Sequence, residues 1–352
     1  MRIATFEVIP YSLAFREPYV TARGTLHNRE SILLRVRDED GLEGLGEAVP
    51  LSLRGGASIK QVATELDDWL GQAAALPDGD EEPPPLSSPA RCALWSAGAD
   101  LTGKREAIPA FATLPGVKAS HAPTPIRCNA TLVAGPPERV ARDAAAWAAD
   151  GFTTFKLKVG NGGEDVGQVR AVRETVGPGA RMRVDANGAW TVDEAENVLS
   201  EMAGYELELA EQPVSTLEEM AELRGRTQVS LAADESVASP QEAARAREIE
   251  ACEVATVKLS KVGGAAGAMA IEQILGVYLS SALDGPVGIA AAAHVAQGLA
   301  SSELAHGLAT QRLFVETIAS AECELRDGDL HLPPGPGLGV VIDEAALERC
   351  RL

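Results

Sequence analysis

The sequence is poor in cysteine and in basic residues, and each shortage excludes a class of protein. Five cysteines, an odd number, are widely scattered and show no CxxC spacing, which argues against both a disulfide framework and a zinc site. Lys and Arg number 31 against 51 Asp and Glu, which gives a net charge of −20. Nucleic acid and anionic membrane surfaces are therefore not expected as partners, because both are recognised through clustered basic residues.

Long apolar runs are also missing. No stretch reaches about 18 uninterrupted apolar residues, the minimum for a membrane span. The first residues, MRIATFEVIPYSLAF, lack a basic segment followed by an apolar run and alternate as a strand does. We expect a cytoplasmic protein that does not enter a membrane.

The overall composition is that of a globular protein, with 45% hydrophobic and 23% charged residues. A chain of 352 residues suits a barrel of about 250 residues plus a smaller domain. Residues 1–115 read as strands followed by helices, with a hairpin turn at DEDG, and predict an α+β capping domain. Hairpin signals return in residues 320–352, which we expect to complete that domain.

Residues 116–319 repeat a strand, a loop and a helix. This alternation predicts a modified (β/α)8 barrel of the TIM type that carries the active site, with an open doubly wound sheet as the alternative. The eight expected strands are 126–133, 153–160, 181–187, 205–213, 229–236, 254–261, 277–283 and 304–309.

Charged residues stand near the carboxyl ends of five consecutive expected strands, where barrel enzymes carry out their chemistry. They recur at intervals of about 25 residues, close to one strand-plus-helix unit. Residues i and i+2 of a strand share a face, so both lysines of KLK point the same way. The second and sixth strands are opposed in an eight-stranded barrel, so amines face each other across three acids. The set is Lys156 and Lys158, then Asp185, Glu211 and Asp234, and finally Lys258.

Three carboxylates with room for water and substrate suit Mg²⁺ better than zinc. A substrate carboxylate would complete the coordination of the metal and present its α-carbon to the lysines. A desolvated lysine beside another cation has a lowered pKa, which suits a base. The pattern therefore predicts Mg²⁺-dependent abstraction of a proton next to a carboxylate, with an enediolate intermediate.

The motifs KLK, DAN, EQP, DES and VKLSK together resemble the enolase superfamily, specifically its muconate-lactonising subgroup. In that superfamily a Lys or His base works with Mg²⁺. The resemblance implies that Asp185, Glu211 and Asp234 bind Mg²⁺. It also implies that Lys158 is the base, that Lys258 faces it, and that Lys156 contacts the substrate carboxylate.

The same resemblance suggests roles for residues around this set. Asn187 and Glu235 would orient the metal ligands or Lys258. No HxD motif or barrel histidine points to the mandelate-racemase-like branch, and His294 is expected to be a packed histidine. Two expected loops, 16–28 and 50–58, would cover the mouth of the barrel, and Arg54 in LSLRGG would be a partner for a carboxylate.

The segment LSSALDGPVGIAAAAH resembles o-succinylbenzoate synthases. Ser280, Ser281 and the backbone amides near Gly288 would accept a second carboxylate of the substrate, as helix N-termini do. However, LDGPVG also resembles the LEGSIG of muconate cycloisomerases, with Asp284 where those enzymes have glutamate.

The resemblance leaves several functions open. The first choice is o-succinylbenzoate synthase, which eliminates water from a cyclohexadiene carboxylate in the menaquinone pathway. The alternatives are an N-succinylamino acid racemase or dipeptide epimerase, and a muconate cycloisomerase. Dipeptide epimerases carry an acidic DxD segment near the eighth strand, which LAHGLATQ lacks. The intact set of lysines and acids argues against a non-catalytic binding protein. The sequence leaves open whether the chain forms a homo-oligomer.

Overall fold

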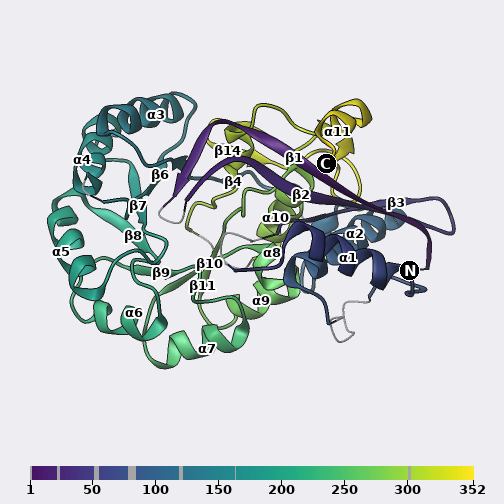
Figure 1. Cartoon of the computed structure of the whole chain (residues 1–352), viewed down its shortest axis with the longest axis horizontal. Helices are drawn as coiled ribbons and strands as arrows, with labels where there is room; N and C mark the ends of the chain where they lie inside the picture. Colours follow the sequence, from purple (N-terminus) through teal and green to yellow (C-terminus); the bar gives the residue numbers. More distant parts are fainter. Residues whose placement is uncertain are drawn as a thin grey trace.

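The structure is a computed structural model that describes residues 2–21, 24–50, 55–77, 85–118, 122–162, 164–299 and 303–352. Arg54 and the adjoining part of the expected 50–58 loop lie outside the described residues. Figure 1 shows the strands β6 to β11 ringed by helices on one side of the molecule, with the N-terminal sheet and helices on the other.

An antiparallel sheet in the order β1–β2–β3 forms the N-terminal part, from β1 (Ile3–Thr21), β2 (Gly24–Asp38) and β3 (Glu43–Ala48). The DEDG hairpin joins β2 to β3 as predicted. The expected loop at 16–28 is instead a continuation of the first hairpin, in which β1 and β2 pair as far as Thr21 and Gly24. This hairpin reaches the barrel (Figure 1). There Glu17 forms an ion pair with Arg139 of α3 (Pro137–Ala149) at 3.1 Å.

Two helices cover one face of this sheet, α1 (Ile59–Leu70) and α2 (Ser88–Glu106). Helix α1 begins at a capping box in which Ser58 and Gln61 satisfy each other's backbone N–H groups. Helix α2 lies directly on β3, because a Cβ at Gly46 would stand 2.0 Å from the carbonyl oxygen of Ala93. A separate core between the sheet and the helices follows from this close packing.

Among the described residues, seven parallel strands form the barrel sheet, and their order in space follows the chain, which confirms the predicted barrel architecture. The strands are β5 (Ala130–Leu132), β6 (Thr154–Lys158), β7 (Arg181–Asp185), β8 (Leu207–Glu211), β9 (Leu231–Ala233), β10 (Val254–Val257) and β11 (Gly276–Leu279). The helices around them are α3 (Pro137–Ala149), α4 (Asp165–Val176), α5 (Val192–Met202), α6 (Leu217–Arg224), α7 (Pro240–Glu248), α8 (Leu259–Val262), α9 (Ala265–Glu272) and α10 (Pro286–Gly298).

The eighth strand, expected at 304–309, is reduced to two bridging residues. His306 bridges in parallel to Cys128, and Gly307 bridges in parallel to Ser280 at the end of β11. The chain then turns at once into a 3₁₀ helix, Ala309–Leu313, which ends the strand early. These bridges link the last strand of the sheet back to the segment before β5 and close the ring.

The C-terminal segment contacts both parts of the molecule. Its elements are β12 (Ala319–Ala321), β13 (Glu324–Arg326), β14 (Asp329–His331), β15 (Val341–Ile342) and α11 (Glu344–Cys350). Strand β14 pairs with β4 (Ile126–Arg127) near the barrel. The amide of Leu338 donates to Asp100 of α2, and the amide of Leu352 donates to Pro10 of β1. The division of the chain at about residue 115 stays a prediction.

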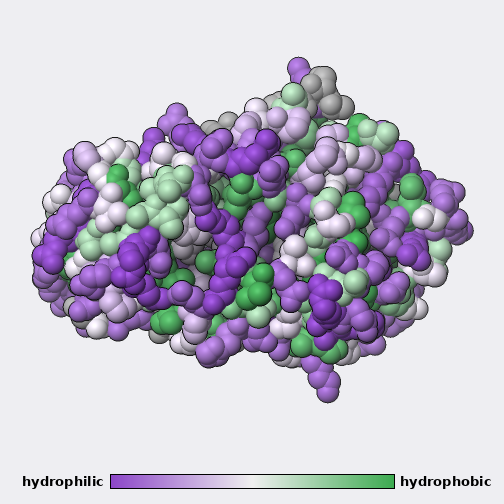
Figure 2. Space-filling view, turned by 90° about the horizontal axis from the view of Figure 1, so that it is seen from above, coloured by the Kyte–Doolittle hydropathy of each residue, from purple (hydrophilic) through white to green (hydrophobic). Residues whose placement is uncertain are grey.

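The exterior is mostly hydrophilic on the face shown in Figure 2, with apolar side chains in small groups. Within the described ranges, no helix is long and apolar enough to cross a membrane.

Candidate active site

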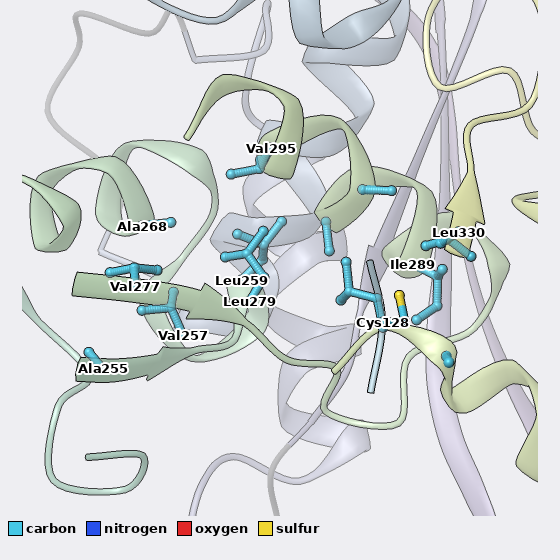
Figure 3. Close-up of a cluster of buried hydrophobic side chains, with 14 of the residues drawn as sticks. Cys128, Ala255, Val257, Leu259, Ala268, Val277, Leu279, Ile289, Val295 and Leu330 are labelled. Carbon is cyan, nitrogen blue, oxygen red and sulfur yellow. The ribbon is translucent and has the colours of Figure 1, made fainter. Parts of the chain in front are cut away.

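Alternation along the strands divides the side chains of β10 and β11 between two environments. Figure 3 shows Val257, Val277 and Leu279 in the apolar cluster that these strands share with α9 and α10. The residues directly before and after these in the chain therefore point the other way, into the barrel. They are Thr256, Lys258, Tyr278 and Ser280. The same alternation puts Lys156 and Lys158 of β6 on one face. A polar interior inside an apolar shell results.

The predicted lysines and acids meet in this interior. The ammonium of Lys156 lies 2.9 Å from Oδ2 of Asp185 and 2.6 Å from Oε2 of Glu211. Lys158 lies 2.6 Å from the same oxygen of Asp185. On the other side, Lys258 forms an ion pair with Asp234. The three lysines are 5 to 6% exposed and the three acids are fully buried, so these charges neutralise each other away from water.

The pKa shifts follow from these contacts. Burial raises the pKa of Asp185, but Lys156 and Lys158 lower it by more, and the net pKa is below its ordinary value. For Glu211, burial and the neighbouring Asp185 raise the pKa. Burial lowers the pKa of Lys158, yet Asp185, Tyr19 and Glu211 together raise it by more. The sequence predicted a lowered pKa for Lys158, and this prediction is wrong for the chain alone because the acid is in direct contact.

The acids of the site have the donor chemistry of a divalent-cation site, although lysines now lie between them. Among the described residues, no three His, Cys, Asp or Glu side chains are gathered closely enough to hold a metal, because lysine ammoniums separate the acids. One oxygen is nevertheless left over, since Oε1 of Glu211 is buried without a hydrogen-bond partner. A buried carboxylate oxygen without a partner is costly. Three carboxylates with such an oxygen among them fit Mg²⁺ in donor chemistry.

Asn187 lies beside the base predicted from the sequence. Its Oδ1 accepts from Lys158 at 3.0 Å, and its Nδ2 donates to Glu235 at 3.1 Å. Its backbone amide donates to Asp185 at 3.0 Å, in a left-handed conformation with φ of 50°. The structure thus places Asn187 at Lys158, whereas the sequence left open whether it serves the metal ligands or Lys258.

Several residues near the acids were not predicted as site residues. Gln212 of EQP is fully buried and accepts from the backbone amides of Asp234 and Ser236, which ties the end of β8 to the end of β9. Lys261, one helical turn after Lys258, contacts Oδ1 of Asp234 at 3.0 Å. KLSK was expected in the strand 254–261, but β10 ends at Val257 and helix α8 begins at Leu259, so Lys258 and Lys261 lie one helical turn apart on a shared face.

Ser281 and Asp284 bond to each other in the turn before α10. The Ser281 hydroxyl donates to Oδ2 of Asp284 at 2.6 Å and accepts from the amide of Asp284 at 2.8 Å. Ser280 directly follows β11, and its amide donates to the carbonyl oxygen of Val257 at 2.8 Å. A substrate-binding role for Ser280, Ser281 or Asp284 stays a prediction.

The N-terminus of α10 is already filled by the chain itself. Glu47 of β3 accepts from the amides of Gly285, Val287 and Gly288 at 2.6, 3.1 and 2.9 Å. The prediction that these amides receive a substrate carboxylate is therefore wrong. Its physical basis was right, because the helix end does bind an anion, but that anion is a buried side chain.

His294 of α10 is a packed histidine, as predicted. Its Nδ1 accepts from the amide of Phe111 at 3.1 Å, and its Nε2 lies 3.3 Å from the carbonyl oxygen of Leu338. Burial lowers its pKa to about 4, so the ring stays neutral. This histidine joins α10 to the segments on either side of it.

Comparisons with known proteins agree with this geometry. Residues 139–346, more than half of the chain, match the family described as "Enolase C-terminal domain-like". Residues 3–77 match "Mandelate racemase / muconate lactonizing enzyme, N-terminal domain".

Two o-succinylbenzoate synthases are among the similar sequences. That of Thermobifida fusca is 41% identical over 202 residues, which cover 54% of this chain and 63% of that enzyme, less than two thirds of its length. That of Mycolicibacterium smegmatis is 35% identical over 299 residues, which cover 82% of this chain and 84% of that enzyme.

Two solved structures superpose closely on the chain. The muconate lactonizing enzyme from Pseudomonas fluorescens, complexed with muconolactone, has a TM-score of 0.90 and 27% identity, covering 100% of this chain and 99% of that one. The dipeptide epimerase from Enterococcus faecalis, complexed with Mg and the dipeptide L-Leu-L-Tyr, has a TM-score of 0.87 and 27% identity, covering 97% and 100%.

Proposed function

The chain belongs to the muconate-lactonising subgroup of the enolase superfamily, and we propose that it removes the proton next to a substrate carboxylate with the help of Mg²⁺. One observation carries this proposal. Buried lysines on opposite sides of the barrel, Lys158 and Lys258, each contact a carboxylate of the same group of acids. Burying so many charges is costly unless they serve one another or a ligand.

We assign the metal to Asp185, Glu211 and Asp234. The buried Oε1 of Glu211, which has no partner, supports this assignment. When bound, Mg²⁺ would supply positive charge beside the substrate carboxylate, where negative charge develops as the proton leaves. We expect the substrate to be a small molecule that carries a carboxylate group.

The lysines share the remaining work. Lys158, held by Asn187, accepts the proton from the α-carbon. The opposing amine is Lys258, which stabilises the enediolate from the other face. Lys156, already bonded to two acids, contacts the substrate carboxylate.

The favoured reaction is that of an o-succinylbenzoate synthase. Lys158 would take the α-proton of a cyclohexadiene carboxylate and return it to the departing hydroxyl, which leaves as water and gives an aromatic product. The segment LSSALDGPVG and the similarity to two such enzymes support this choice.

A second candidate is an isomerase of N-succinylamino acids or dipeptides, in which Lys158 and Lys258 exchange protons with opposite faces of one carbon. The position of the two lysines favours it, as does the fold shared with the dipeptide epimerase. A third is muconate cycloisomerisation, which the fold shared with the muconate lactonizing enzyme supports.

A direct assay separates these reactions. The protein with Mg²⁺ is offered the cyclohexadiene carboxylate, and ultraviolet absorbance follows the aromatic product. The proposal expects product formation that stops when EDTA removes the metal. Racemisation of N-succinylamino acids without any aromatic product would replace the synthase with the isomerase.

A further inference from the structure

A chain of hydrogen bonds inside the barrel ends on one oxygen of Glu211. The hydroxyl of Thr256 donates to Oη of Tyr278 at 2.7 Å, and Tyr278 donates to Oε2 of Glu211 at 2.5 Å. Lys156 contacts the same Oε2 at 2.6 Å, while Oε1 has no partner. The two oxygens of this carboxylate are therefore in different states, one bonded twice and one open.

The neighbours of Tyr278 fix the orientation of its side chain toward Glu211. Its side chain is fully buried and packs with Leu209 and Ala232 inside the barrel. The guanidinium of Arg183 lies 4.7 Å from the centre of its ring. Arg183 is itself fully buried and is fixed by Glu208 and by the carbonyl oxygen of Ala305, at 2.5 and 2.7 Å. Both the ring plane and the hydroxyl of Tyr278 are thus defined by neighbours.

The hydroxyl of Tyr278 is oriented to donate its proton to Glu211. Since Thr256 already uses the oxygen of the phenol as an acceptor, the proton of the phenol is directed at Glu211.

We propose that Tyr278 is a positioning residue that fixes the carboxylate of Glu211 by its Oε2 and leaves Oε1 as the oxygen for a divalent cation. The inference rests on the proposed Mg²⁺ site. Groups that orient metal ligands in this way typically contribute roughly 10- to 100-fold to metal affinity. Tyr278 thus joins β11 to a site whose proposed ligands lie on β7, β8 and the end of β9.

The test compares Tyr278→Phe with the wild type. Phenylalanine keeps the ring and the contact with Arg183 but removes the donor. Isothermal titration calorimetry with MgCl₂ should give a dissociation constant roughly 10- to 100-fold weaker than that of the wild type. The melting temperature without metal should fall, because the buried Thr256 hydroxyl loses its acceptor, and the further increase on addition of Mg²⁺ should be smaller than in the wild type.

Three further variants keep the test decisive. Thr256→Val should weaken Mg²⁺ binding by a smaller factor, because it removes only the second bond of the chain, and Thr256→Ser should restore wild-type affinity. Tyr205→Phe removes a phenol outside the barrel and is the matched control, with unchanged affinity expected. Wild-type affinity in both Tyr278→Phe and Thr256→Val would overturn the inference and leave the proposed function intact. A wild-type chain that binds no Mg²⁺ would overturn both.

Discussion

Buried acids at two places in this molecule, a group of three in the barrel and Glu47 beside α10, are neutralised in different ways. In the barrel, Asp185, Glu211 and Asp234 are surrounded by lysine side chains. At the N-terminus of α10, Glu47 is surrounded by backbone amides. A lysine side chain can change its conformation when a ligand binds, whereas the backbone amides of a helix are fixed in place. The first group is therefore suited to chemistry and the second to holding the sheet of β3 against the barrel.

The pKa shifts of Asp185 and Glu47 have opposite directions. Neighbouring ammonium groups outweigh burial at Asp185 and lower its pKa. At Glu47, burial and the charge of Asp284 outweigh three amide donors and raise the pKa to about 7. The full charges beside Asp185 therefore compensate its burial better than the backbone dipoles beside Glu47 do.

The largest expected effect belongs to the barrel group. Lys158→Ala should lower kcat by on the order of 10³-fold or more, because it removes the proposed base, while Mg²⁺ binding persists. Steady-state kinetics and calorimetry measure the two quantities. Lys60→Ala, an exposed lysine of α1, is the control and should leave both unchanged. Full activity in the Lys158 variant would show that Lys158 is not the base.

The next effect belongs to Glu47 and depends on pH. The folded pKa of about 7 lies above the ordinary 4.5, so the folded chain holds this proton more tightly. The stabilisation is complete below pH 4.5 and is lost as pH rises through 7. The difference in unfolding free energy between wild type and Glu47→Gln should therefore fall by about 3 kcal/mol over that interval.

Urea denaturation at a series of pH values measures this difference. Glu→Gln at an exposed position, Glu7 of β1, serves as the control. A difference that stays flat between pH 4.5 and 7 would mean that the amides alone stabilise the carboxylate, and the contrast between the two groups would disappear.

A third variant sharpens the description of the barrel group. Asn187→Ala removes the side-chain acceptor that Asn187 provides for Lys158, and kcat should fall by roughly 10- to 100-fold, as for other groups that orient a functional residue. Asn187→Asp keeps an acceptor and should retain more activity. Equal loss in both variants would point to the left-handed backbone at this position instead.

The smallest effect is expected at the turn before α10. Ser281→Ala removes a hydroxyl bonded to Asp284, so the unfolding free energy should fall by about 1 kcal/mol while KM stays unchanged. Thermal unfolding and kinetics check the two parts. A tenfold rise in KM with unchanged stability would instead support the substrate contact predicted from the sequence.

Much of the site could be predicted because its main residues lie at the ends of strands, where their order along the chain becomes their order around the barrel. Residues that act through partners distant in sequence could not be found in this way. Tyr278 and Glu211 are 67 positions apart, and Gly285 and Glu47 are 238 apart. The eighth strand was misjudged in length, because two backbone bridges at His306 and Gly307 leave no periodic pattern to read.

One measurement tests the central claim most directly. The α-proton of each carboxylate in a panel of the cyclohexadiene carboxylate, N-succinylamino acids and dipeptides is followed by ¹H NMR in D₂O, with the protein and either Mg²⁺ or EDTA. The account predicts that this signal disappears for at least one substrate, only with Mg²⁺, and not with Lys158→Ala. Signals that persist for the whole panel, while calorimetry shows Mg²⁺ bound, would contradict it.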